Sequence, residues 1–364
     1  MVRIMAGREA GAPDFQALAQ MPHDSTPRAI IKGLLRNEPP PRPLLMPIIF
    51  SLGARLENQQ LRDFQSNPTK ISNALRQIRS VLKVDGLACY FDPFLEAEAL
   101  GSKREWLDDG SCRLLPPAFS SADDLRRQNS FDSFADKGRI PVARQVIQRL
   151  KVMLKDEPAL ISCVSGPFTF AAQLAGQDPV ARPEPPQDLV EFAAEVGATV
   201  SKSFLEAGAD VVFLRESWLP EFSPDTCRWY SSLLAPIANV IRFYEALPVL
   251  LLGPEGLSDA NRNLIAGCDW DCVLCPFVSD PTASLDNWRQ TRNLGVGCAL
   301  PLHSFACNSM NSWTLDNASQ LRQCLFLTSS DDLSATTEIP QLTARLDSIR
   351  QFLEAQHPLS RSGS

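Results

Sequence analysis

Short apolar runs alternate along this chain with longer segments of helical spacing. Runs such as ALISCVS (159–165) and PVLLL (248–252) show no alternation of polar and apolar positions. A strand of that kind is buried on both faces, which is typical of a parallel sheet. The predicted strands are residues 44–50, 86–91, 159–165, 210–214, 248–252, 271–277, 296–302 and 324–328.

The segments between these runs carry apolar residues at helical spacing. Clear examples are residues 67–84, 141–154, 189–208 and 339–356. Eight strand and helix units in one domain predict a (β/α)8 TIM barrel, an α/β fold, with a doubly wound open sheet as the alternative. We expect the barrel to span residues 26–358, preceded by a flexible tail at 1–25 and followed by a short tail at 359–364.

Composition narrows the class of protein. The chain has 364 residues, and its hydrophobic content of 44% is enough for a large core. A net charge of -7 argues against a broad basic surface for nucleic acid or anionic lipid. No apolar stretch reaches the roughly 18 residues of a membrane span, and cysteines within apolar runs are typical of reduced thiols. We therefore expect a cytoplasmic protein without nucleic-acid or membrane partners.

Function in such a barrel belongs at the carboxyl ends of the strands, where the strand-to-helix loops gather. Polar and charged residues follow most of the predicted strands. These candidate site residues are Ser51, Arg55, Asp92, Gln173, Arg215, Glu216, Ser217, Glu255, His303, Ser329, Ser330 and Asp331.

Asp92 has two roles that the sequence leaves open. It is a favourable N-cap for a helix that begins at Pro93 and ends at Gly101. Alternatively, its charge faces the substrate. In the second case Asp92→Asn should lower turnover by about a hundred- to a thousandfold while stability changes by less than about 1 kcal/mol, since asparagine caps nearly as well.

Histidine and cysteine add two further hypotheses. His303 follows a predicted strand and suits a general base, a proton donor, a metal ligand with Cys307, or a residue that ties down a loop. Cys268, Cys272 and Cys275 have the CxxxCxxC spacing of some iron–sulfur enzymes. The last two lie three apart on a predicted strand and would point to opposite faces, so we expect no cluster and no metal.

Several segments, taken in order, resemble the uroporphyrinogen decarboxylase superfamily. They are MPIIFSLGARL after the first strand, YFDPFLEAEALG after the second, SGPFTFAAQLAG after the third and GADVVFLRESW at the fourth. The resemblance covers roughly residues 26–355 and implies a TIM barrel. It also implies a lyase that removes a carboxyl group without a cofactor and forms a homodimer.

The same resemblance suggests roles for individual residues. Asp92 takes the position of the family's essential aspartate, which stabilises positive charge on the substrate, and Arg55 that of a carboxylate-binding arginine. His303 is the second candidate for catalysis, and the remaining candidates would bind substrate. The implied substrate is a carboxylated cyclic or aromatic small molecule.

The departures from the family pattern keep two alternatives open. Ser51 replaces an arginine, Gln173 replaces a tyrosine, and SSDD (329–332) replaces a glycine-histidine-glycine segment, so uroporphyrinogen itself is not the expected substrate. The family's other branch transfers methyl groups to or from a corrinoid protein with zinc, but leucines stand at its zinc-binding strand (250–252). A catalytically silent barrel that binds a ligand is the third hypothesis.

Overall fold

The computed structural model describes residues 26–36, 38, 40–107, 112–115, 121–128, 131–155, 157–177, 184–253, 270–276, 295–300, 302, 305 and 325–356. Within these residues one parallel sheet has the strand order β1-β10-β9-β8-β7-β6-β5-β2. Its strands are β1 (Leu44–Leu45), β2 (Gly86–Tyr90), β5 (Ala159–Ser165), β6 (Val211–Glu216), β7 (Leu247–Leu252), β8 (Cys272–Pro276), β9 (Gly295–Leu300) and β10 (Phe326–Ser329).

The first and last strands of that order also meet, so the sheet closes on itself. The backbone N–H of Asp85 donates to the carbonyl of Leu45 at 2.9 Å. The Asp85 carboxylate in turn accepts from the Leu45 N–H at 2.8 Å. The predicted TIM barrel is thus confirmed. The eight strands lie within or close to the predicted apolar runs, although β1 covers only Leu44–Leu45 of the predicted 44–50.

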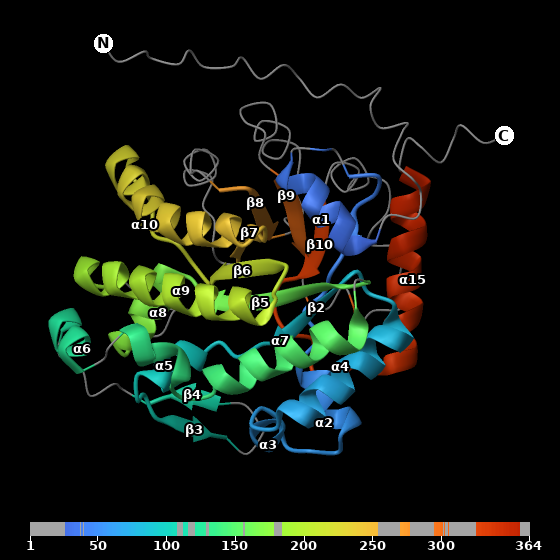
Figure 1. The fold of residues 1–364 in the computed structure, drawn as a ribbon, viewed down its shortest axis with the longest axis horizontal. Helices are drawn as coiled ribbons and strands as arrows, with labels where there is room; N and C mark the ends of the chain where they lie inside the picture. Colours follow the sequence, from blue (N-terminus) through green and yellow to red (C-terminus); the bar gives the residue numbers. More distant parts are fainter. Residues whose placement is uncertain are drawn as a thin grey trace, which may run out of the picture.

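Helices cover the outside of the barrel (Figure 1). The long ones are α4 (Pro68–Leu82), α7 (Ile140–Leu154), α9 (Gln187–Ala207), α10 (Pro224–Phe243) and α15 (Ile339–Gln356). Their ends follow ordinary capping chemistry. Asn67 accepts from the N–H of Lys70 ahead of α4, and Gly208 ends α9 with a φ of 110°, which glycine adopts without strain.

Shorter helices occupy the connections: α1 (Pro27–Leu35), α2 (Ser51–Leu56), α3 (Leu61–Phe64), α5 (Leu95–Ala99), α6 (Ala122–Gln128) and α8 (Pro167–Leu174). Helix α1 lies at the amino ends of the strands, because Arg28 donates to Asp210, just before β6, at 2.7 Å and to the carbonyl of Lys155, ahead of β5. Helix α1 therefore does not cover the carboxyl ends of the strands, where the strand-to-helix connections lie.

Two further details differ from the sequence predictions. Strands β3 (Arg104–Trp106) and β4 (Cys112–Leu114) form an antiparallel hairpin that was not predicted, since each is too short to show a period. The helix expected at Pro93 begins instead at Leu95, because the Asp92 carboxylate accepts from the Phe94 N–H at 3.0 Å and stabilises a turn there.

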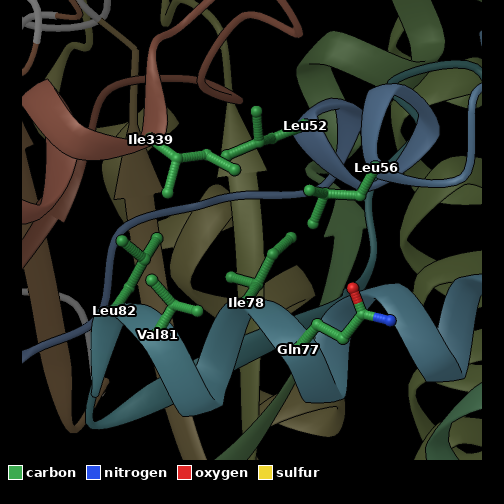
Figure 2. A pocket seen from close by; sticks show the side chains of 7 residues that line it. All are labelled: Leu52, Leu56, Gln77, Ile78, Val81, Leu82 and Ile339. Carbon is green, nitrogen blue, oxygen red and sulfur yellow. The ribbon is translucent and has the colours of Figure 1, made fainter.

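A pocket of about 280 Å³, including space open to solvent, lies where α2, α4 and α15 meet (Figure 2). Its lining is apolar apart from Gln77. The residues around it are Leu52, Leu56, Gln77, Ile78, Val81, Leu82 and Ile339. It lacks the converging polar groups of a substrate site, so we assign it to imperfect packing between helices. Among the described helices, none is long and apolar enough to cross a membrane.

Candidate active site at the carboxyl ends of the strands

The predicted site residues that the structure describes lie at the carboxyl end of the barrel. Asp92 follows β2, Arg215 and Glu216 end β6, and Ser330 and Asp331 follow β10. The others at this end are Ser51 and Arg55 in α2, Gln173 in α8, Ser217 after β6 and Ser329 at the end of β10. Their substrate-binding roles remain predictions, but their partners separate them into groups.

Asp92 sits in a buried cluster of charges. Its side chain is 1% exposed. Its Oδ2 accepts from Arg139 Nη2 at 2.7 Å, and Arg104 Nη1 forms an ion pair with it at 2.8 Å without the geometry of a hydrogen bond. Glu98 bridges the same two arginines, with its Oε2 2.7 Å from Arg104 Nε and 2.7 Å from Arg139 Nη2. Together with the Phe94 N–H, these contacts engage both oxygens of Asp92. Its charge is therefore matched inside the protein.

The cluster joins segments that are far apart in the sequence. Arg104 belongs to the β3–β4 hairpin, and its guanidinium also lies 5.6 Å from the centre of the Phe94 ring. Arg139 directly precedes α7 and donates to the side-chain oxygen of Gln65. The cluster therefore fixes the hairpin and the start of α7 against the end of β2.

Glu216 is saturated by internal hydrogen bonds. One carboxylate oxygen accepts from the Phe168 N–H and the Tyr230 hydroxyl, each at 3.0 Å. The other accepts from the N–H and the hydroxyl of Thr169 at 2.9 and 2.7 Å. Burial raises the pKa of this carboxyl to about 7 against the effect of these donors. We assign Glu216 to capping the start of α8 rather than to contact with a ligand.

Ser51 is engaged by a residue that the sequence analysis missed. Asp332 accepts from the hydroxyl of Ser51, from its N–H at 2.9 Å and from the Phe50 N–H at 2.7 Å. Burial raises the pKa of Asp332 to about 7. This network ties the loop after β10 to the end of β1. The pattern SSDD indicates a polar loop, but not which of its two aspartates turns inward.

Arg215 points across the mouth of the barrel. Its Nη2 lies 2.8 Å from Oδ2 of Asp331, and its Nη1 donates to the Ser217 hydroxyl at 3.1 Å. The guanidinium stands 5.8 Å from the centre of the Phe91 ring, within range of a cation–π contact. Its buried Nε has no hydrogen-bond acceptor in the part of the chain that the structure describes. The side chain is only 14% exposed.

Gln173 and Arg55 have different surroundings. Gln173 donates from Nε2 to the carbonyl of Pro93 at 2.9 Å, and its buried Oε1 has no donor among the described residues. Arg55 is 40% exposed, pairs with Glu338 at 3.0 Å, and donates to two carbonyls of the loop before α15. Gln173 thus offers an acceptor beside the end of β2 that no described residue fills, whereas Arg55 is engaged at the rim.

Glu96 was also missed, and it lies beside the end of β5. The residue is 1% exposed and accepts from the Ser165 N–H at 3.2 Å and the Ser165 hydroxyl at 2.9 Å. Burial raises the pKa of this carboxyl to about 7, although both bonds lower it. Nothing in EAEALG distinguishes Glu96 from Glu98 except helical position, which the sequence analysis did not use.

The raised pKa of Glu96 should make the free energy of unfolding fall as the pH rises. The folded pKa of Glu96 exceeds its ordinary value of 4.5, so its contribution is complete below about pH 4.5 and lost as the pH rises through about 7. The free energy of unfolding, measured with urea, should be lower at pH 8 than at pH 5. Glu96→Gln should reduce this difference by about 2–3 kcal/mol. Glu105→Gln, at an exposed ion pair, should keep the wild-type dependence. An unchanged dependence in Glu96→Gln would show that Glu96 titrates normally.

The described residues do not fit a metal centre. No group of three or more histidine, cysteine, aspartate or glutamate side chains suited to a metal occurs among them. At the end of β7, where the methyltransferase branch would place zinc ligands, residues 250–252 are fully buried leucines. His303, Cys307, Glu255 and Cys268 lie outside the described residues, as do the predicted tails at 1–25 and 359–364.

Comparisons with known proteins now identify the family. The family model of uroporphyrinogen decarboxylase (URO-D) matches residues 26–290. A methylated-thiol–coenzyme M methyltransferase of Methanosarcina mazei is 29% identical over 131 residues, which are 35% of this chain and 35% of that protein. A uroporphyrinogen decarboxylase of Erythrobacter litoralis is 26% identical over 212 residues, 54% of this chain and 59% of that protein.

A solved methyltransferase from Methanosarcina mazei has the same fold. It superposes with a TM-score of 0.67 at 14% identity, over 89% of this chain and 99% of that one. The chain spans about a third and about three fifths of the two curated relatives that it matches. Since the family model covers well over half of its 364 residues, the chain belongs to the uroporphyrinogen decarboxylase family.

Proposed function

We propose that this protein is a methyltransferase of the family, which moves a methyl group between a corrinoid and a small thiol. The thiol carries an anionic group that Arg215 binds. The observation that carries the proposal is the state of Asp92. A carboxylate that is 1% exposed and held by two arginines is poorly suited to the role that decarboxylation would require.

The decarboxylase reading needs an aspartate whose charge faces the substrate. Electrostatic catalysis depends on charge aimed at the position where opposite charge develops. Here Arg104 and Arg139 already lie within 2.8 Å of Oδ2, and the Phe94 N–H occupies Oδ1. This arrangement favours a structural role for Asp92, and the similarity to a methylated-thiol methyltransferase supports the same choice.

Arg215 suits the recognition of a carboxylate or sulfonate. Its guanidinium is largely buried, stands over Phe91 and keeps a donor without an acceptor among the described residues. Charge-assisted hydrogen bonds from arginine to such anions are strong and oriented. A small thiol that carries such an anionic group would then be held at the mouth of the barrel through that group.

The reaction balances without an added oxidant. The thiolate forms a carbon–sulfur bond with the methyl group, and the methyl–cobalt bond of the corrinoid breaks with its electron pair left on cobalt. The thiol proton passes to solvent. Arg215 and Phe91 orient the thiol in this scheme, and we assign no step to a metal, since the described residues offer no ligand set.

Methylcobalamin and 2-mercaptoethanesulfonate test the proposal directly. The methylated thiol should appear by mass spectrometry together with the loss of methylcobalamin absorbance. Arg215→Gln should raise the KM for this thiol by about 10- to 100-fold, the value of a charged hydrogen bond, with a smaller change for neutral 2-mercaptoethanol. Equal effects on the two thiols would contradict anion recognition by Arg215.

Decarboxylation is the second candidate, because the match to a uroporphyrinogen decarboxylase is the longer of the two curated ones. Release of carbon dioxide from a panel of aromatic and pyrrole carboxylic acids, with no methyl transfer to any thiol, would favour it. Neither reaction with any of these probes would favour the barrel that only binds a ligand.

A further inference from the structure

The ion pair between Arg215 and Asp331 spans the barrel. Arg215 belongs to β6, and Asp331 follows β10. In the closed ring these strands are opposite, since β7, β8 and β9 separate them on one side and β5, β2 and β1 on the other. A contact of 2.8 Å between their side chains therefore crosses the mouth, where barrels of this type bind substrate.

We propose that Asp331 occupies the binding place of a ligand carboxylate or sulfonate, and that an anionic ligand displaces it from Arg215. The inference rests on the anion-binding role proposed for Arg215, not on the reaction itself. It changes the part predicted for Asp331, which becomes an internal competitor of the ligand rather than one of its contacts.

The two partners differ in how well they are buried. The Arg215 side chain is 14% exposed and that of Asp331 is 44% exposed. A largely buried guanidinium needs an anionic partner, because its own solvation is reduced. An aspartate that is almost half exposed loses little on turning into water, because its carboxylate is already partly solvated. Replacing Asp331 by another anion at Arg215 should therefore cost little free energy.

The neighbours of Asp331 are anchored, so its side chain can turn without the loop moving. The Ser330 N–H donates to the carbonyl of Leu300 at 2.8 Å, and Asp332 is bound to the Ser51 hydroxyl. Besides Arg215, the Asp331 carboxylate accepts from the Asp332 N–H at 2.8 Å. Asparagine at position 331 would retain this local bond and lose the charge.

The surroundings of Arg215 indicate the shape of the ligand. The Phe91 ring lies under the guanidinium, and the Ser217 hydroxyl contacts Nη1. The Nε–H, without an acceptor among the described residues, is a further donor for the oxygen of a ligand. Benzenesulfonate combines an anion with a flat apolar body and is a suitable probe, with benzamide as the neutral match.

Titration calorimetry of benzenesulfonate at fixed ionic strength tests the inference. Asp331→Asn should bind this anion about tenfold more tightly than the wild type, a difference of about 1.4 kcal/mol. Benzamide binding should not change. Asp347→Asn, which neutralises an exposed aspartate paired with Arg350 on α15, should bind benzenesulfonate as the wild type does.

Other outcomes would overturn it. The inference is wrong if Asp331→Asn binds benzenesulfonate as weakly as the wild type or more weakly. It is also wrong if the gain in affinity persists after Arg215→Gln is added, or if no variant binds benzenesulfonate. Asp331→Ala serves as a second variant if Asp331→Asn does not fold. Tighter binding by Asp331→Asn without methyl transfer to any thiol would support the anion site and reject the proposed reaction, so the two failures are distinguishable.

Discussion

Replacement of Gly166 by alanine is expected to destabilise the protein by about 3–5 kcal/mol, the sum of overpacking and of lost buried hydrogen bonds. A Cβ at this position would lie 2.2 Å from Cδ and 2.6 Å from Cγ of Glu216. Glu216 has no room to yield, because it is 0% exposed and its four hydrogen bonds hold it against Thr169, Phe168 and Tyr230. The methyl group would either displace the carboxylate from its donors or separate α8 from β6.

Urea unfolding of the purified variant measures this effect, and the chain provides a matched control. Gly197 lies inside α9, where the nearest atom to an added Cβ would be Ile237 Cδ1 at 3.5 Å. Gly197→Ala should therefore be neutral or stabilise by up to about 1 kcal/mol, the difference in helix propensity. A loss below about 1 kcal/mol for Gly166→Ala would mean that Glu216 is not held as its contacts indicate.

The fold could be predicted because barrel strands carry their burial in the sequence. Each continuous apolar run contains a strand, short in the case of Leu44–Leu45, and the last helix has the predicted bounds, Ile339–Gln356. The placement of candidate residues at the carboxyl ends followed from the fold alone. Fold and family could thus be predicted because their patterns extend over many residues. The details of individual side-chain contacts do not change such patterns.

The contacts within the site could not be predicted in the same way. Asp92 is matched by Arg104 and Arg139, and neither position has a pattern that points to it before the hairpin and α7 are placed. Asp331 and Asp332 are adjacent and chemically identical, yet one crosses the barrel to Arg215 and the other binds Ser51. Such choices depend on side-chain direction, which the three-dimensional structure decides.

Asp92→Asn is expected to lower the free energy of unfolding by about 3 kcal/mol, more than the sequence analysis predicted for a helix cap or a catalytic charge. The side chains involved are 1% exposed for Asp92, 5% for Arg104 and 13% for Arg139. Asparagine retains the acceptor for the Phe94 N–H, but among the described residues it leaves two buried guanidinium groups with Glu98 as their remaining anion. Removal of one partner from a buried ion pair is costly because the other charge stays desolvated.

A double-mutant cycle with Arg104→Leu separates this effect from a simple loss of shape. If Asp92 stabilises the fold through its charge, the double variant should recover part of the loss, with a coupling of at least about 1.5 kcal/mol in urea unfolding. Asp347→Asn, at an exposed pair on α15, should cost less than about 0.5 kcal/mol. Collapse of methyl transfer in Asp92→Asn at unchanged stability would instead return Asp92 to direct contact with the substrate. Additive losses in the cycle would show that solvent already screens the cluster, so that Asp92 serves mainly as the acceptor of the turn at Phe94.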